Sequence, residues 1–414
     1  MTQEEGTQRM AAARRHEALA LVAPDPARHG EAICDLVSKT FSGDGFFESR
    51  NHCRNGYILN SAYDWKASRI GLVGDRLVTH FGVWDITMRI GKARVRMGGI
   101  GGVSTDPEYR KRGLMARTAR AAIAAMRECG YDVSVLFGIR DFYHRFGYVR
   151  AWSQCDYIVP AGELPKERPA ARLRTLKPGP RDDLVRLYNR ASARFTGTAV
   201  KPARTRRLWQ PFVQGRFWTD ARGRMAGYVV FRPRDGRLEC REACGDPEQV
   251  LRALATVARQ SACGEIRLEA MPYDSPLIRR VRWGNCRAET HHARCGGAMV
   301  ATINLASTLE KMRGELQDRL RASHFASWRG DLVVADARQA ATLGINRSHV
   351  RVTPGGRSRH AIRGGDRVAQ LLIGTDDPAE IIRAARMRTT GDALAMARVL
   401  FPNEHPVMGL LDRF

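Results

Sequence analysis

Apolar and polar residues alternate along the chain with two periods, one typical of helices and one typical of strands. A period of 3.6 marks an amphipathic helix, and a period of two marks a strand with one buried face. The first predicted elements are a helix over 31–41, strands over 69–74, 77–90 and 94–103, a helix over 113–128 and a short strand over 132–137. Antiparallel strands with flanking helices predict an α/β (α+β) fold.

Two further stretches carry helices and strands of their own after the linker Pro160–Pro165. The first holds predicted helices over 182–193 and 247–260 and strands over 225–231, 237–243 and 265–271. The second holds an apolar segment over 299–305, strands over 331–335 and 350–352, and helices over 309–320, 378–385 and 391–400. Because 414 residues are too many for one ordinary core, we predict three domains, over 1–158, 159–295 and 296–414.

The chain is strongly basic, with 68 Lys and Arg residues against 43 Asp and Glu and a net charge of +25. Such a balance suits polyanion binding, but nucleic-acid modules more often concentrate charge in a patch with interleaved aromatic residues. Here the charge is mostly Arg and is spread over the whole length. We therefore favour a solvated, Arg-rich surface and predict no specific nucleic-acid partner.

Three features predict a cytoplasmic protein. No apolar run is long enough to form a spanning helix, so no membrane partner is expected. The N-terminal segment Met1–Arg15 is polar, and the short apolar run after it lacks a convincing cleavage site. The nine cysteines are odd in number and contain no Cys-x-x-Cys pair, which is typical of reduced thiols.

One stretch carries a chemical pattern: Val103-Ser104-Thr105-Asp106-Pro107-Glu108-Tyr109-Arg110-Lys111-Arg112-Gly113-Leu114-Met115. It joins a buried strand to a helix, whose N-terminus offers unpaired N–H groups and about half a unit of positive charge. Gly113 allows close approach of a ligand, and the Arg110 guanidinium suits phosphate. The pattern predicts a pyrophosphate site. The alternative is an ordinary surface turn.

This stretch resembles the acyl-CoA-binding signature of the GNAT acetyltransferases, Arg/Gln-x-x-Gly opening a helix after a strand. Met115 departs from the Gly or Ala of the commonest form and resembles the bulky apolar residue of the enhanced intracellular survival (Eis) subfamily. The resemblance implies two tandem GNAT-like domains followed by a sterol carrier protein-like α/β domain. The second copy is expected to be degenerate, because Cys244–Pro247 replaces the signature there, and the third domain contains Val368–Gly374.

The resemblance also implies acetyl-CoA as the acyl donor, no metal, and an acyltransferase of the EC 2.3.1 type. The pantetheine arm would pair with backbone groups of Val103, Ser104 and Thr105. The pyrophosphate would lie against Arg110, Lys111, Arg112, Gly113, Leu114 and Met115. Family relatives assemble as hexamers, so a homo-oligomer, with a hexamer as the family form, is the expected state.

Tyr143 is the candidate proton donor. It lies in Phe142–Tyr148, which resembles the second GNAT motif, whose first Tyr commonly acts as general acid. A free phenol has a pKa of about 10 and a free thiol about 8.5, so complete proton transfer is uphill by roughly 2 kcal/mol. A hydrogen bond to the departing sulfur is therefore the expected contribution. The alternative is a packed aromatic turn, which Asp141 is expected to cap.

Phe414 is the candidate base, through its α-carboxylate. The strand before the Arg110–Gly113 turn has no Glu or Asp, and Asp106 after it is expected to form a turn. Eis proteins use the C-terminal carboxylate, and the apolar, Phe-terminated end of this chain resembles theirs. An α-carboxyl has a pKa of about 3.5 in water, and burial beside apolar groups would raise it. The alternative is a terminus docked for packing alone.

Two other patterns are set aside. Gly98–Gly102 lacks the third Gly that a dinucleotide-binding finger requires. The group of Cys286, His291, His292 and Cys295 contains no paired Cys-x-x-Cys, so no zinc site is expected.

The resemblance leads us to expect an acetyl-CoA-dependent N-acetyltransferase in which a primary amine attacks the thioester directly. The amine is an aminoglycoside, a lysine side chain or another small amine. Phe46, Phe47 and Trp84 are candidates for the amine side of the site or for the core. The alternative is a non-catalytic acyl-CoA-binding or basic nucleic-acid-associated regulator that keeps a GNAT core.

Overall fold

The structure is a computed structural model that describes residues 18–42, 45–59, 61–177, 181–202, 214–293 and 295–414. The N-terminal segment Met1–Arg15, on which the predicted compartment partly depends, lies outside these residues. The chain separates into two compact units, the first made of residues 1–85, 98–131 and 414, and the second of 86–97 and 132–413. The division into three domains stays a prediction.

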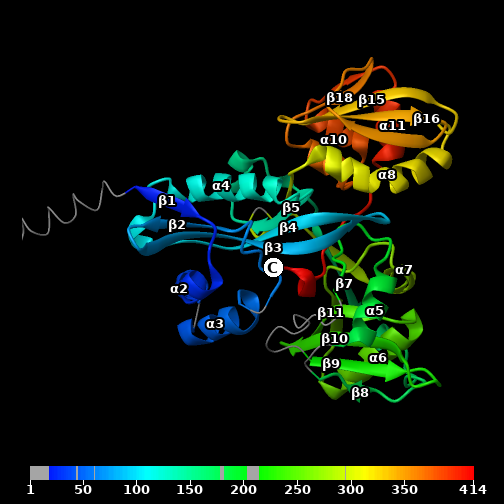
Figure 1. Cartoon of the computed structure of the whole chain (residues 1–414). Helices are drawn as coiled ribbons and strands as arrows, with labels where there is room; N and C mark the ends of the chain where they lie inside the picture. Colours follow the sequence, from blue (N-terminus) through cyan, green and yellow to red (C-terminus); the bar gives the residue numbers. More distant parts are fainter. Residues whose placement is uncertain (1–17, 43–44, 60, 178–180, 203–213, 294) are drawn as a thin grey trace, which may run out of the picture. The chain divides into compact units, whose positions relative to one another are not determined.

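The first unit is a sheet with helices on both faces (Figure 1). Its strands, in spatial order, are β1 (Leu19–Val22), β2 (Arg69–Val73), β3 (Arg76–Ile90) and β4 (Ala93–Thr105). Helices α2 (Pro26–Phe41) and α3 (Phe46–His52) lie on one face, with a π-helical turn at Cys53–Tyr57, and α4 (Leu114–Glu128) lies on the other. Asp25 begins α2 as an N-cap, because its carboxylate accepts a hydrogen bond from the Arg28 amide at 2.8 Å.

The second unit contains a strand that the sequence pattern assigned elsewhere. β14 (Gly297–Thr302) pairs antiparallel with both β5 (Val133–Gly138) and β6 (Val149–Arg150). The apolar segment over 299–305 therefore does not begin a separate third sheet, and Leu305 is already the first residue of helix α8 (Leu305–Arg321). β14 and β5 are more than 150 residues apart in the sequence, so their pairing depends on tertiary contacts rather than on the local sequence pattern.

A second sheet of the same unit has seven strands. In spatial order they are β13 (Arg287–His291), β7 (Gln154–Pro160), β12 (Glu265–Leu268), β11 (Arg237–Cys244), β10 (Met225–Arg234), β9 (Gln214–Thr219) and β8 (Arg174–Thr175). β11 and β12 are parallel and the other pairs are antiparallel. The associated helices are α5 (Asp182–Ala191), α6 (Pro247–Gln260) and α7 (Pro276–Arg282). Val250, Leu254 and Phe231 belong to one buried cluster, and Tyr188 and Tyr228 to another.

The remaining sheet follows the order β17 (His349–Pro354), β16 (Ala340–Asn346), β15 (Arg329–Ala335), β18 (His360–Arg363) and β19 (Arg388–Thr390). Its helices are α8, α9 (Val368–Leu372), α10 (Pro378–Ala384) and α11 (Ala393–Leu400), and the chain closes with a 3₁₀ turn at Leu410–Asp412. The protein is thus a mixed α/β molecule with several sheets, at least two of which combine parallel and antiparallel pairs. No helix in the described part of the chain is long and apolar enough to cross a membrane.

Candidate functional site

The loop between β4 and α4 is organised by Asp106. Its carboxylate accepts a hydrogen bond from the Glu108 amide at 3.1 Å, which begins a 3₁₀ turn over Pro107–Tyr109. The same carboxylate pairs with Arg76 at 2.8 Å. Asp106 is therefore committed to the turn, and the prediction that it forms a turn is confirmed.

Gly113 sets the start of α4. Its φ of 72° and ψ of 4° are left-handed, a conformation that costs an L-residue roughly 1–2 kcal/mol. A Cβ at this position would meet no atom within 4 Å, so the glycine is needed for its backbone angles rather than for space. The chain can then turn sharply and present the first amides of α4, which have no partner inside the helix.

The residues before Gly113 give this helix terminus a positive surface. Arg110, Lys111 and Arg112 are all exposed, and Leu114 and Met115 in the first turn are half-buried. The Arg110 Nε donates to the Thr105 carbonyl at 3.3 Å, and an Arg112 Nη donates to the Glu108 carbonyl at 2.8 Å. Exposed guanidinium groups beside unpaired amides are suited to a phosphate group.

The end of β4 is held by a buried histidine that the sequence patterns did not single out. His80 Nδ1 lies 2.7 Å from the carbonyl oxygen of Gly102, and its Nε2 lies 2.8 Å from the Tyr63 hydroxyl. Burial lowers the pKa of His80 to about 4, so the ring is neutral, donates from Nδ1 and accepts at Nε2. This contact fixes Gly102, whose φ of 55° bends the strand just before Val103, Ser104 and Thr105. No local signal distinguishes such a histidine from any other strand residue.

The C-terminal residue lies on the same strand, within the first unit. A Cβ at Gly99 would come within 2.6 Å of the Phe414 ring, and a Cβ at Gly101 would lie 3.2 Å from the Phe414 carboxyl carbon. Gly99 therefore makes room for the Phe414 ring, whereas Gly101 makes room chiefly for the Tyr57 hydroxyl and lies beside the Phe414 carboxyl group. The structure brings Phe414 next to the strand that carries the predicted pantetheine-binding residues Val103–Thr105.

Aromatic side chains surround this part of β4. Trp84 is fully buried, and its indole N–H donates to the Tyr57 carbonyl at 3.0 Å. The Tyr57 and Trp84 rings are 4.6 Å apart, and the Tyr57 hydroxyl is among the atoms nearest to Gly101. Trp84 is thus a core residue beside the site. Phe46 is half-buried, and Phe47 is 78% exposed, so Phe47 belongs to neither the core nor an enclosed pocket.

The segment just before Phe414 is anchored inside the second unit by a buried charge cluster. Lys201 lies 2.5 Å from Glu242 and 3.3 Å from Asp412, and the Tyr188 hydroxyl donates to Asp412. Burial disfavours the Lys201 ammonium, but the two carboxylates outweigh this effect and raise the pKa of Lys201. Leu411 packs with Tyr188 in the same region. These contacts fix the chain two residues before its end.

Tyr143 belongs to the second unit, in a 3₁₀ turn over Tyr143–Phe146. Its ring packs against Phe142 at 4.9 Å, and burial raises the pKa of Tyr143 to about 12. The nearby Tyr148 hydroxyl pairs with Ser134 at 2.7 Å, whereas no hydrogen bond joins the Tyr143 hydroxyl to another described residue. Of these two tyrosines, Tyr143 is therefore the one whose hydroxyl is not engaged by another described residue, although its side chain is buried.

The predicted cap of this turn is wrong. Phe142 occupies the N-cap position and no side chain caps the turn. Asp141 has a left-handed φ of 57°, and its carboxylate pairs with Arg140 at 2.9 Å instead. The Asp141 carboxylate thus pairs with the exposed side chain of the preceding residue and does not accept a hydrogen bond from the amides of the turn.

Both histidines of the group considered for zinc have other partners. His291 Nε2 lies 3.0 Å from an Arg267 nitrogen, and His292 Nδ1 lies 2.8 Å from the Ser153 hydroxyl. Over the residues that the structure describes, no group of three or more His, Cys, Asp or Glu side chains has the arrangement of a metal site.

Comparison with protein families matches residues 38–151 to an acetyltransferase (GNAT) domain. The search of curated proteins found no match. The solved structures that cover 96% of this chain include a GCN5-related N-acetyltransferase from Anabaena variabilis (TM-score 0.75, 16% identity, 100% of that chain), one from Kribbella flavida (0.70, 21%, 98%) and Eis1 from Mycobacterium abscessus (0.66, 15%, 100%). The TM-scores show a shared fold, and at these low identities they show the fold alone. The family match lies on β3, β4, α4 and the Tyr143 turn, so residues 38–151 form a GNAT acetyltransferase domain, a fold that implies acyl-CoA-dependent acetyl transfer.

Proposed function

We propose that this chain is an acetyl-CoA-dependent N-acetyltransferase of the Eis type, in the EC 2.3.1 class. Its substrate is a primary amine, such as an aminoglycoside, a lysine side chain or another small amine. The position of the C-terminal carboxyl group beside Gly101 carries this proposal, because it places a carboxylate on a strand that has none of its own.

In this proposal acetyl-CoA binds along the end of β4. The backbone of Val103, Ser104 and Thr105 pairs with the pantetheine arm. The pyrophosphate lies on the first amides of α4 and on Arg110, with Lys111, Arg112, Gly113, Leu114 and Met115 completing the turn. A backbone N–H that meets the developing oxyanion contributes about 3–4 kcal/mol in comparable sites.

Two groups of the protein assist the reaction, one at the attacking amine and one at the departing thiolate. The Phe414 carboxylate takes a proton from the amine as its nitrogen attacks the thioester carbonyl. The tetrahedral intermediate then collapses and breaks the carbon–sulfur bond. Tyr143 stabilises the departing thiolate by a hydrogen bond, since burial keeps its phenol protonated.

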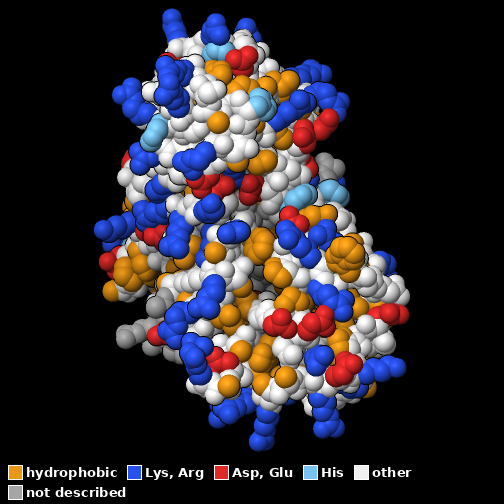
Figure 2. All heavy atoms as spheres, turned by 90° about the vertical axis from the view of Figure 1, so that its right-hand side faces the viewer, with side chains coloured by type: hydrophobic (Ala, Val, Ile, Leu, Met, Phe, Trp, Pro, Cys, Tyr) orange, Lys and Arg blue, Asp and Glu red, His pale blue; other side chains and the backbone are white. Residues whose placement is uncertain are grey.

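Acetyl-CoA turnover with a panel of amines tests this function. Free thiol release that depends on the amine supports the transferase, and mass spectrometry of the amine identifies the acetylated product. Binding of acetyl-CoA without thiol release would instead support a regulator. Strongly salt-dependent binding to DNA or RNA would support the nucleic-acid alternative, although Figure 2 shows Lys and Arg interspersed with Asp and Glu on the visible face rather than gathered in one patch.

Arg110→Gln is expected to raise KM for acetyl-CoA about 10- to 100-fold, because a hydrogen bond to a charged group contributes about 1.5–3 kcal/mol. kcat should change little, since the pyrophosphate is bound equally in the ground and transition states. Arg117→Gln is the matched control, because Arg117 is exposed further along α4. Steady-state kinetics with varied acetyl-CoA measures KM for both variants. Equal KM values would contradict the proposed pyrophosphate site.

Tyr143→Phe is expected to lower kcat about a hundredfold, the low end for general acid assistance, while KM stays nearly constant. With the pKa of Tyr143 at about 12, the wild-type rate should show no loss from this group up to pH 10. Tyr148→Phe is the control, since Tyr148 is committed to Ser134. A fall in kcat of equal size in both variants would assign Tyr143 to packing.

The proposal includes the arrangement of the whole chain. A second GNAT-like domain that has lost the signature and a sterol carrier protein-like third domain follow the catalytic domain. The protein is cytoplasmic and assembles as a homo-oligomer, with the hexamer as the family's form. Analytical ultracentrifugation of the purified protein tests the last point.

A further inference from the structure

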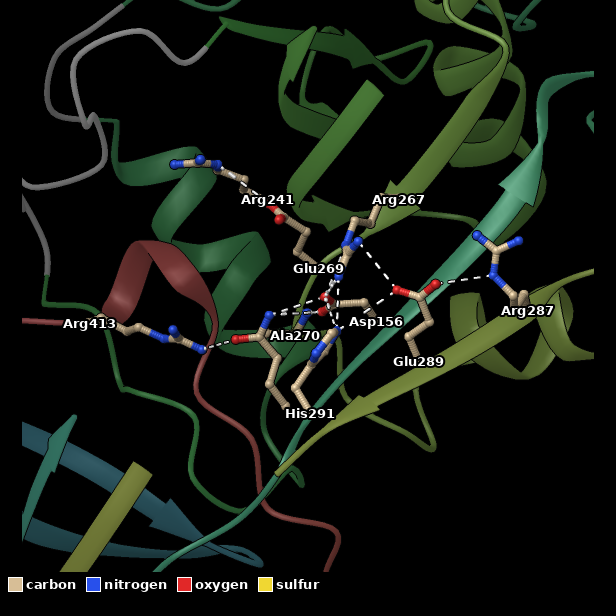
Figure 3. A network of polar contacts seen from close by, with 10 residues as sticks. Asp156, Arg241, Arg267, Glu269, Ala270, Arg287, Glu289, His291 and Arg413 are labelled. Atoms are coloured by element: carbon tan, nitrogen blue, oxygen red, sulfur yellow. Dashed lines mark hydrogen bonds and ion pairs between the residues drawn. The ribbon is translucent and has the colours of Figure 1, made fainter. Parts of the chain in front are cut away.

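The second unit contains a pocket that the proposed reaction does not use. It has a volume of about 220 Å³ and is lined by Phe137, Trp152, Gln154, Arg267, His291 and Arg413, with small residues between them. Figure 3 shows Arg267, His291 and Arg413 from different parts of the sequence converging on one region. The volume of liquid water per molecule is about 30 Å³, so the pocket has room for a molecule of about seven heavy atoms.

The charge at the base of the pocket is already balanced. Asp156 is fully buried and accepts hydrogen bonds from Arg267 at 2.7 and 3.0 Å and from the Ala270 amide at 2.9 Å. The Gln154 amide also donates to this carboxylate, at 3.1 and 3.2 Å. The charge of Asp156 is therefore paired with Arg267, and its oxygens accept several hydrogen bonds. The hydrogen bonds from the Gln154 amide to Asp156 fix the orientation of that amide.

Arg413 makes no direct ion pair with this network, although Asp156 and Glu269 attract its charge from a distance. One Nη donates to the Gln154 side-chain oxygen at 2.7 Å, and the guanidinium lies 4.4 Å from the centre of the Phe137 ring. Its Nε is buried without a hydrogen bond, and no ion pair joins it to a carboxylate of the described residues. Burial lowers the pKa of Arg413 to about 10, because holding this charge away from water costs more than the attraction of Asp156 and Glu269 returns.

The side chains that line the pocket offer donors rather than acceptors. His291 accepts from Arg267 at Nε2, so its Nδ1 carries the ring proton and can donate. Arg413 keeps unused N–H groups, and the walls formed by Phe137, Trp152 and Ala298 are apolar. Such a lining fits a small planar anion with a short apolar portion.

We propose that this pocket binds a small aliphatic carboxylate, whose oxygens receive hydrogen bonds from Arg413 and His291 and whose carbon chain lies against Phe137 and Trp152. A guanidinium pairs well with either a carboxylate or a phosphate, so the apolar walls decide: a short carbon chain can lie against them, and inorganic phosphate has none. Because Arg413 immediately precedes Phe414, an occupied pocket also steadies the proposed base. That consequence rests on the proposed function, whereas the binding itself does not.

Isothermal titration of the full chain with butyrate measures binding without any turnover. We expect a Kd of about 1 mM or tighter for wild type and at least a tenfold weaker affinity for Arg413→Gln. Arg287→Gln is the matched control: Arg287 belongs to the same polar network through Glu289, lies outside the pocket, and should leave the affinity unchanged. Equal affinity of wild type and Arg413→Gln, or no heat with wild type, overturns the site.

Two further arms make the test independent of the folding of one variant. His291→Ala alters a half-exposed side chain and should weaken butyrate binding several-fold while the melting temperature stays within the error of the measurement. Inorganic phosphate should bind at least tenfold more weakly than butyrate. Unchanged binding in His291→Ala, or phosphate affinity equal to that of butyrate, contradicts the assignment to a carboxylate.

Discussion

Deletion of Phe414 is expected to lower kcat by about 10²–10⁴-fold while acetyl-CoA still binds, because general base assistance typically contributes that much. The truncated chain ends at Arg413. Its new terminal carboxylate therefore lies one residue earlier in the chain and no longer beside Gly101 on β4. The Arg110–Gly113 turn does not include the chain end, and its affinity for the cofactor should persist. Thiol-release kinetics gives kcat, and calorimetry with acetyl-CoA gives the affinity.

Two further variants separate the carboxylate of Phe414 from its ring. Adding one glycine after Phe414 keeps the ring against Gly99 but moves the terminal carboxylate away from Gly101, so kcat should fall as in the deletion. Phe414→Leu keeps a terminal carboxylate and an apolar side chain, so most of kcat should remain. If the added glycine leaves kcat intact while Phe414→Leu abolishes it, the chain end serves packing rather than proton transfer.

Local sequence patterns were sufficient to predict the elements that carry the candidate site. The helix predicted over 113–128 is α4, Leu114–Glu128, and the helix predicted over 247–260 is α6 with those same bounds. Each begins at a residue with a local effect: Gly113 adopts the left-handed conformation, and Asp246 caps the first turn. Start signals of this kind act within a few residues, which is why one sequence reveals them.

The glycines of β4 show what a local pattern misses. The sequence places Gly98–Gly102 on the strand before the Arg110–Gly113 turn, and the only glycine motif that it suggests there, a dinucleotide-binding finger, lacks one glycine. In the structure Gly99 leaves room for the ring of Phe414, at the opposite end of the chain, and Gly101 leaves room for the Tyr57 hydroxyl and lies beside the Phe414 carboxyl group. The sequence alone does not show why glycine is needed at these positions, because the side chains that they contact come from distant parts of the chain. The same holds for His80, whose importance depends on Gly102 and Tyr63 lying beside it.

The cluster around Lys201 was equally beyond a sequence prediction. Lys201, Glu242 and Asp412 come from three distant segments, and each alone has the appearance of a surface residue. Their burial together follows from the docking of the C-terminal segment, where Leu411 joins an apolar cluster with Tyr188. A buried ammonium is tolerated here because two carboxylates neutralise it and a phenol hydrogen-bonds one of them.

Lys201→Met is expected to destabilise the protein by about 3–5 kcal/mol, because removing one partner of a buried ion pair leaves the other charge uncompensated. Here the variant leaves Glu242 and Asp412 facing each other without a cation. Burial already raises the pKa of Glu242, and the lost attraction of Lys201 would raise it further. The chain has more than one compact unit, so the first thermal transition by calorimetry is the appropriate measurement rather than a two-state fit.

A double variant distinguishes uncompensated charge from lost packing as the cause. Adding Glu242→Gln to Lys201→Met removes one of the two carboxylates, so part of the lost melting temperature should return. The exposed pair of Arg383 with Glu380 supplies the control, since Arg383→Met should change stability by less than about 1 kcal/mol. If the double variant melts below Lys201→Met, the cluster is held by packing of the lysine stem. Recovery would instead show that charge balance at Asp412 secures the segment ending in Phe414, and kcat should then recover together with the melting temperature.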